Sequence, residues 1–177
     1  MKPSIKRVVE ILRADKRYKR LLEAFDSAPL YNIPRESIIE EVKRIHELRE
    51  IRRLNPRDSG FVDKLILANT HDQSARSRLT EILMRCIHVG TKLSDAIAAL
   101  KQHFLLEYSD HLRQFRTKEE RSMVLNIALR KFIKYVEEVN NLKMVVEVVI
   151  TDIDKGSWSL RASIQAMEIS SKREVQL

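Results

Sequence analysis

The sequence predicts an all-α protein, and three observations lead to that prediction. Only three glycines and four prolines occur in 177 residues, too few for the tight turns of an all-β fold or the phosphate loops of a Rossmann-type fold. Apolar residues recur every three or four positions along much of the chain, which is the spacing of a helix with one buried face. No proline occurs from Phe61 to about Leu112, so long helices with few connections are expected.

The first third of the chain predicts two helices. The first covers Ser4 to about Phe25, and two prolines in DSAPLYNIPRES end it. Pro34 and Glu36 suit the first turn of the second helix, where a fixed φ and a negative charge are favourable. Its apolar positions extend to about Leu54, and NPRDSG ends it.

The central and C-terminal parts predict longer helices. Residues 61–112, interrupted only by Gly90, suit one very long helix or two stacked ones. Thr117 and Glu120 form the pattern of a capping box at the start of the next helix. Beyond it, apolar residues follow steps of three and four, as in a coiled-coil heptad; we call them the heptad stripe, and they are Leu125, Leu129, Phe132, Val136, Val139, Val146, Ile150 and Ile153. The β-branched run VVEVVIT lies inside this stripe and is therefore expected to be helical.

Gly156 and Trp158, the only tryptophan, stand close together where the stripe ends. Glycine reaches the left-handed conformation that ends many helices, and Ser157 could cap the next helix. We therefore expect a hinge at Gly156 and a short last helix that Trp158 docks onto the rest of the protein. The alternative is that Trp158 is exposed and stacks on unpaired bases.

This pattern predicts three consecutive segments and an oligomer. Residues 1–27 would form a basic N-terminal helix or arm, residues 28–58 a second helix and linker, and residues 59–177 a helical core that also oligomerises. A monomer would expose the stripe unless its other helices cover it, so we expect a homo-oligomeric helical ring. The predicted oligomerisation residues are Leu125, Leu129, Phe132, Val136, Val139, Val146, Ile150 and Trp158.

Positive charge is concentrated at the N-terminus. The net charge is +8, and residues 1–20 hold eight basic side chains against Glu10 and Asp15. Such a terminus indicates a polyanionic partner, usually nucleic acid and sometimes a membrane surface, although it could instead be a solvated helix. Further arginine-rich clusters could add phosphate contacts without sequence readout. The predicted nucleic-acid-binding residues are Lys6, Arg7, Arg13, Lys16, Arg17, Lys19, Arg20, Arg52, Arg53, Arg57, Arg76, Arg78, Lys101, Arg113 and Arg116.

No pattern of catalysis or metal binding is visible in the sequence. The single cysteine, Cys86, excludes an intrachain disulfide and fits a reducing compartment. Cys86-x-His88 has no second pair at zinc spacing, and Glu107 with His111 lacks the further carboxylates of a diiron site. Phosphate-loop, nucleophile-elbow and zinc-protease motifs are absent from the sequence. We therefore expect no enzyme activity, no cofactor and no metal. Without a run of apolar residues long enough for a membrane span, we expect a cytoplasmic protein with no membrane partner.

The C-terminal part resembles a known family. From RTKEERSMVLNIALRKF to VVITDIDKGSWSLRASIQAMEIS, the order of features is similar to the C-terminal half of the UvsY family, recombination mediators of tailed bacteriophages. The matches are the turn from Asp152 to Trp158, the terminal IQAM, and ALKQHFLLEYSDHL with Lys101 and Tyr108. The family's Lys-x-Arg is replaced here by Lys101-Gln102-His103. The similarity covers about the last 100 residues.

This resemblance implies a helical protomer that forms a ring, binds single-stranded DNA and helps to load a recombinase against a single-strand-binding protein, in an infected bacterial cell. The function expected is therefore a non-enzymatic recombination mediator. The alternative is a phage DNA-packaging or virion assembly component, such as a small terminase subunit or a head or neck protein, because that class also uses helical rings with basic faces.

Overall fold

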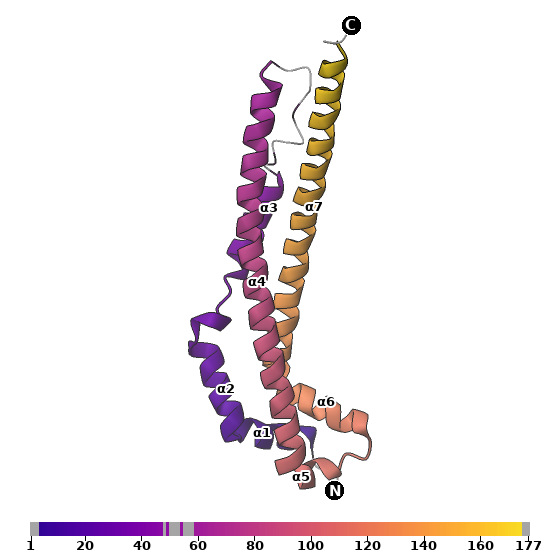
Figure 1. Ribbon diagram of the computed structural model, residues 1–177. Helices are drawn as coiled ribbons and strands as arrows, with labels where there is room; N and C mark the ends of the chain where they lie inside the picture. Colours follow the sequence, from indigo (N-terminus) through magenta and orange to yellow (C-terminus); the bar gives the residue numbers. More distant parts are fainter. Residues whose placement is uncertain (1–3, 48, 50–53, 55–58, 175–177) are drawn as a thin grey trace. The chain divides into compact units, whose positions relative to one another are not determined.

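The protein is all-α, as predicted. The computed structural model describes residues 4–47, 49, 54 and 59–174 (Figure 1), apart from the side chains at 30, 159–161 and 163–174. No strand occurs in these ranges. The helices are α1 (Ile5–Ala14), α2 (Lys16–Ser27), α3 (Arg35–Glu47), α4 (Phe61–Glu107), α5 (Ser109–Arg113), α6 (Lys118–Ala128) and α7 (Arg130–Glu174), with a 3-10 turn at Pro29–Tyr31. In the part of the chain described, no helix has the length and apolar character needed to cross a membrane.

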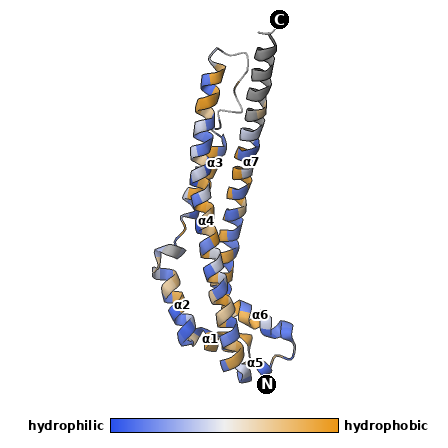
Figure 2. Cartoon of the chain, viewed as in Figure 1, coloured by the Kyte–Doolittle hydropathy of each residue, from blue (hydrophilic) through white to orange (hydrophobic). Residues whose placement is uncertain are grey.

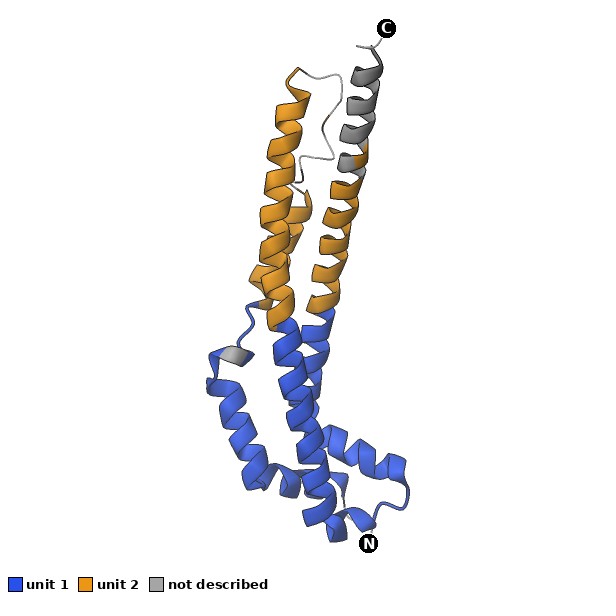
Figure 3. Cartoon of the chain, viewed as in Figure 1, with its two compact units in different colours: residues 1–34, 86–141 blue, residues 35–85, 142–177 orange. Residues whose placement is uncertain are grey.

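The helices form two compact units, each built from two separate stretches of sequence. Unit 1 contains residues 1–34 and 86–141, and unit 2 contains residues 35–85 and 142–177 (Figure 3). The long helices α4 and α7 each contribute one part to each unit. Hydrophobic and hydrophilic residues intermingle along α4 and along the coloured part of α7 (Figure 2), as expected of helices with one buried face. This division differs from the three consecutive segments expected from the sequence.

The core of unit 1 is centred on aromatic side chains. Phe104 and Phe132 are fully buried, and Tyr18 and Phe25 approach Phe132 edge-on with ring centroids 5.6 and 5.4 Å away. Helix α1 packs against α6, burying Val8, Val9 and Leu12 in the same cluster. The N-terminal helices are therefore part of a folded unit rather than a separate arm.

Asp15 breaks the first predicted helix in two. The expected single helix from Ser4 to Phe25 is wrong, because Asp15 is extended (ψ 143°) between α1 and α2. Its carboxylate caps α2 by accepting hydrogen bonds from the amides of Arg17 (2.7 Å) and Tyr18 (3.2 Å). It also accepts a hydrogen bond from the Tyr108 hydroxyl (2.8 Å), and His103 Nε2 lies 3.0 Å away. The aspartate is thus an N-cap with tertiary partners. The helical spacing of apolar residues continues past Asp15 and does not reveal this break.

The predictions for the other helices have mixed outcomes. Residues 61–107 form one very long helix, and the capping box of Thr117 and Glu120 is present. The run VVEVVIT is helical, as expected. However, α3 ends at Glu47, short of the predicted Leu54; residue 54 itself is not helical, and residues 48 and 50–53 lie outside the described residues.

The heptad stripe lies inside the protein. Leu125, Leu129, Phe132, Val139 and Val146 are buried, and Val136 and Ile150 are half-buried. The free seam on which the oligomerisation prediction depended is therefore missing, because helices of the same chain cover most of it. The stripe is also interrupted, since α6 ends at Ala128 and α7 begins at Arg130. Assembly into a ring stays a prediction, and it now requires a different surface.

The predicted hinge at Gly156 is also wrong. Helix α7 continues through Gly156 to Glu174, and the only glycine with positive φ is Gly60 among the residues described. There is accordingly no separate short last helix, and Ser157 caps nothing. Gly156 instead allows a close approach within unit 2: a Cβ atom there would lie 2.5 Å from Nη2 of Arg49. Glycine is needed at this position for space rather than for a turn.

Candidate nucleic-acid interface

Six of the predicted cations at the N-terminus form an exposed basic surface on α1 and α2. The side chains of all six are exposed; Lys16 and Arg20, for example, lie one turn apart, across α2 from buried Tyr18. No ion pair involves these side chains within the part of the chain that is described. We call this set the α1–α2 cations; it consists of Lys6, Arg7, Lys16, Arg17, Lys19 and Arg20.

Other predicted cations are held by partners within the protein. Nε and Nη2 of Arg13 donate to the carbonyl oxygens of Ala128 (3.1 Å) and Ile127 (3.0 Å). These carbonyls belong to the last turn of α6, the negative end of the helix dipole, which favours a cation. Arg13 therefore stabilises the packing of α1 against α6, and we no longer expect it to bind nucleic acid.

Three further arginines are paired with acidic side chains. Arg76 forms two hydrogen bonds with Asp154, at 2.5 and 3.2 Å. Arg78 contacts both Glu41 (3.1 Å) and Glu81 (3.2 Å), and Arg113 lies 3.4 Å from Asp110. These exposed pairs neutralise much of the charge that a phosphate would meet.

The remaining predicted cations divide into three cases. Arg52, Arg53 and Arg57 lie outside the described residues. The side chain of Arg116 is exposed, while its backbone amide donates to Glu120 (2.8 Å). Lys101 is half-buried and lines a groove in unit 1.

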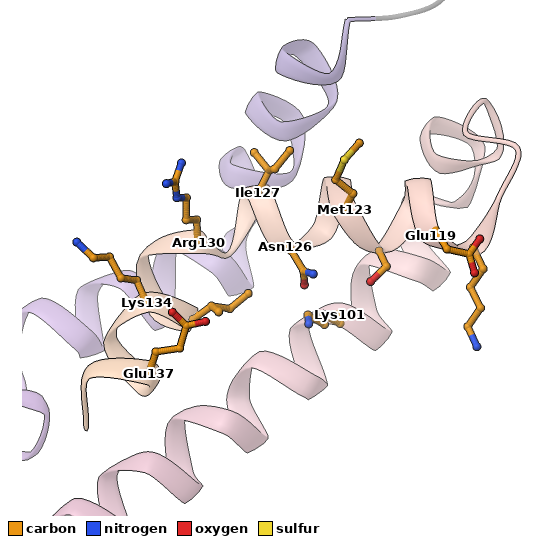
Figure 4. A pocket seen from close by; sticks show the side chains of 11 residues that line it. Lys101, Glu119, Met123, Asn126, Ile127, Arg130, Lys134 and Glu137 are labelled. Atoms are coloured by element: carbon orange, nitrogen blue, oxygen red, sulfur yellow. The ribbon is translucent and has the colours of Figure 1, made fainter. Parts of the chain in front are cut away.

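This groove lies between α4 and the α6–α7 segment, and we call it the α6–α7 groove. It is open to solvent, with a volume of about 1110 Å³. Figure 4 shows Lys101 on α4 facing Asn126 of α6 across it. The other lining side chains come from α6 and α7, and they are Lys118, Glu119, Ser122, Met123, Ile127, Arg130, Ile133, Lys134 and Glu137. Four cations against two acids leave the groove a net positive charge.

Arg130 and Lys134 were missed as candidates by the sequence reasoning. They lie at i and i+4 in RKFIK, on one face of the first turns of α7. That spacing is a usable signal, but the apolar residues of the heptad stripe dominate the pattern in this segment. Their place beside Lys101 depends on the break at Leu129, which the sequence did not reveal.

A buried charge cluster organises unit 2. Arg49, 5% exposed, donates to both carboxylate oxygens of Asp72, with the shortest distance 2.7 Å, and to Asp152 at 2.5 Å. Buried charges are tolerated when they are paired in this way. The cluster places Arg49 against Gly156 and fixes the part of α7 that carries Trp158.

The Trp158 side chain does not dock onto the fold. It is 76% exposed, so the expectation that it anchors a terminal helix is wrong for the single chain. It lines two small hollows of unit 2, one with Thr151, Asp154 and Lys155, the other with Gln73, Arg76, Asp154 and Ser157. Exposure of such a large ring leaves it available for a ligand or a partner.

The carboxyl group of Asp15 in unit 1 has a strongly shifted pKa. Burial alone would raise the pKa of its carboxyl group, but hydrogen bonds with His103, Tyr108 and two backbone amides together lower that pKa to about 2. The Asp15 hydrogen bond in turn raises the pKa of the Tyr108 hydroxyl. Since Asp15 also caps α2, we interpret this cluster as support for the α1–α2 cations rather than as catalytic machinery.

Comparison of the chain with protein-family models, curated proteins and solved structures found no match.

Proposed function

We propose that this protein is a non-enzymatic single-stranded DNA-binding protein that acts as a recombination mediator. The observation that carries the DNA-binding part is the set of α1–α2 cations: six exposed side chains without acidic partners in the described structure. The mediator role and the preference for single strands come from the resemblance of the C-terminal part to the UvsY family.

The physical basis is recognition of the phosphate backbone. Cationic side chains displace the counterions condensed on a nucleic acid, so binding falls steeply as salt rises. Arg13 and Asp15 hold α1 and α2 in place through partners on α6, α4 and the residue after α4. The cations are therefore presented on a folded surface, which costs less conformational entropy on binding than a flexible tail does.

The test is salt-dependent binding of a labelled oligo(dT) strand, measured by fluorescence anisotropy. The triple variant Lys16→Ala, Lys19→Ala, Arg20→Ala should bind more weakly and show a flatter salt dependence. Removing one phosphate contact reduces the log–log slope by about 0.7 for single strands, so removing three should reduce it by about 2. Circular dichroism should show unchanged helix content, because all three side chains are exposed.

A matched control removes the same charge elsewhere. Lys43, Arg44 and Lys64 are also exposed, but they lie on α3 and the first turn of α4. Their triple alanine variant should keep the wild-type slope. Equal losses in both triple variants would show that net charge alone matters and would contradict an interface on α1 and α2.

Two further comparisons test the mediator role. Tighter binding to duplex than to single strands would contradict it and favour the packaging or virion alternative. Addition of the protein should also speed the assembly of a recombinase on DNA already covered by a single-strand-binding protein; no acceleration would leave DNA binding standing and refute mediation.

A further inference from the structure

Trp158 stands out because its surroundings combine an exposed ring with polar groups and a cation. The indole lies on α7 and is 76% exposed. A large apolar ring in this position is unusual for a residue that serves only the fold, since tryptophan is highly buried on average.

Two hollows meet at this ring. The first, with a volume of about 250 Å³, is lined by Gln73, Arg76, Asp154, Ser157 and Trp158. It is smaller than the roughly 300–1,000 Å³ of pockets for drug-sized ligands, so it suits one flat ring system. The second, about 460 Å³, is lined by Thr151, Asp154, Lys155 and Trp158, and it brings an exposed lysine beside the same ring.

Ser157 and Gln73 are the uncharged polar residues that line the first hollow. Ser157 is 8% exposed, and its Oγ atom is buried without a hydrogen-bond partner. A buried hydroxyl normally has a partner, because leaving it unsatisfied costs about 1–3 kcal/mol. Because the Oγ atom of Ser157 has almost no accessible surface, a ligand in the hollow would not reach it. The hydrogen bonds that the hollow offers a ligand come instead from Gln73, which also lines it.

The charges around the ring are arranged for a phosphate on one side only. In the first hollow Arg76 is bound by both oxygens of Asp154, so this pair offers hydrogen bonds but little net charge. In the second hollow Lys155 has no ion pair among the described side chains. An aromatic ring with hydrogen-bonding edges beside Gln73 and an anion beside Lys155 would fit the two hollows.

We propose that Trp158 is the stacking platform for an unpaired nucleobase of single-stranded DNA, with Gln73 contacting the base edge and Lys155 an adjoining phosphate. This inference rests on the proposed function and adds a base-contacting site in unit 2 to the phosphate-contacting surface of unit 1. Stacking on aromatic side chains is tolerant of sequence and requires unpaired bases, so the site would favour single strands over duplex.

Trp158 is the only tryptophan, so its fluorescence reports on this site directly. The full-length protein is titrated with end-labelled oligo(dT) while tryptophan emission and the anisotropy of the label are recorded together. We expect the emission to be quenched in parallel with the rise in anisotropy. An abasic strand with the same phosphates, and a duplex of the same length, should bind through charge but leave the emission largely unquenched.

Variants separate stacking from folding. Trp158→Ala should keep the melting temperature, because the ring is exposed, and should bind oligo(dT) about 5- to 150-fold more weakly, the range that stacking supplies per base. Trp158→Phe should restore most of the affinity. The matched control is Val148→Ala, which removes another exposed apolar side chain of α7 and should leave binding unchanged.

The outcomes are distinguishable. Rising anisotropy with unchanged emission would overturn the stacking site and leave DNA binding intact. No rise in anisotropy would overturn the proposed function, and the stacking site with it. Emission of the free protein that shifts to shorter wavelength with protein concentration would show that a second copy covers Trp158, which would also overturn the stacking site.

Discussion

Replacing Gly156 by alanine tests whether the close approach of Arg49 to Gly156 in unit 2 requires a glycine. A Cβ atom at this position would lie 2.5 Å from Nη2 of Arg49 and 3.6 Å from its Cζ. The first distance is too short for any stable contact. The guanidinium cannot simply swing away, because hydrogen bonds to Asp72 and Asp152 hold it in a buried position.

The expected magnitude follows from two opposing terms. Displacing Arg49 breaks a buried ion pair, which costs about 3–5 kcal/mol when one charge is left uncompensated. Alanine is better than glycine in the interior of a helix by about 1 kcal/mol. Gly156→Ala should therefore lower the free energy of unfolding by about 2–4 kcal/mol, as measured by urea denaturation monitored by circular dichroism.

A second helical glycine provides the control. At Gly90 in α4 the nearest side-chain atoms would be 3.6 and 3.9 Å from a new Cβ, which is ordinary contact. Gly90→Ala should consequently stabilise the protein by up to about 1 kcal/mol. In an Arg49→Leu background, Gly156→Ala should lose its penalty. If Gly156→Ala alone is as stable as the wild type, the explanation of Gly156 by close approach is wrong.

Three further predictions concern unit 1. The pKa of Asp15 is lowered to about 2 from an ordinary 3.8, so its ionised form stabilises the folded state fully above about pH 4, and this contribution disappears as pH falls to about 2. The difference in melting temperature between the wild type and Asp15→Asn should therefore narrow between about pH 4 and about pH 2. A difference that stays constant over that interval would contradict the lowered pKa. Arg13→Met removes two hydrogen bonds to the end of α6 and should lower the free energy of unfolding by about 1–2 kcal/mol, with little effect on oligo(dT) affinity. A large loss of affinity without a loss of stability would show that Arg13 contacts DNA. Phe132→Ala should cost about 3–5 kcal/mol in urea denaturation; a stable protein with a smaller oligomer by light scattering would instead restore the stripe as an interface.

The helical class could be predicted from the sequence because it depends on spacing and on the scarcity of turn-forming residues. The capping box at Thr117 and the helical state of VVEVVIT are local or periodic features, and both predictions were confirmed. The break at Asp15 was missed because the aspartate's partners, His103 and Tyr108, are far away in sequence.

The candidate site was less predictable, for the same reason. The sequence shows which residues are cationic, but which cations are neutralised depends on acids elsewhere in the fold, as with Arg76 and Asp154. Glycine has two uses in a protein, freedom of φ and lack of bulk, and the sequence around Gly156 favours the first. Only the position of Arg49 distinguishes them, and a single sequence does not give it.

The interleaving of the two units has a consequence for synthesis in the cell. Unit 2 needs residues 35–85 together with residues from 142 onward, so the earlier stretch leaves the ribosome well before its partner exists. At about 5–20 residues per second, the wait from residue 85 to residue 157 is about 4–14 s. During that time Leu65 and Leu79, which are buried in the finished protein, lack the later stretch of their own unit. The nascent chain should therefore be a client of holding chaperones at this stage, and neither unit can be produced alone as one uninterrupted fragment.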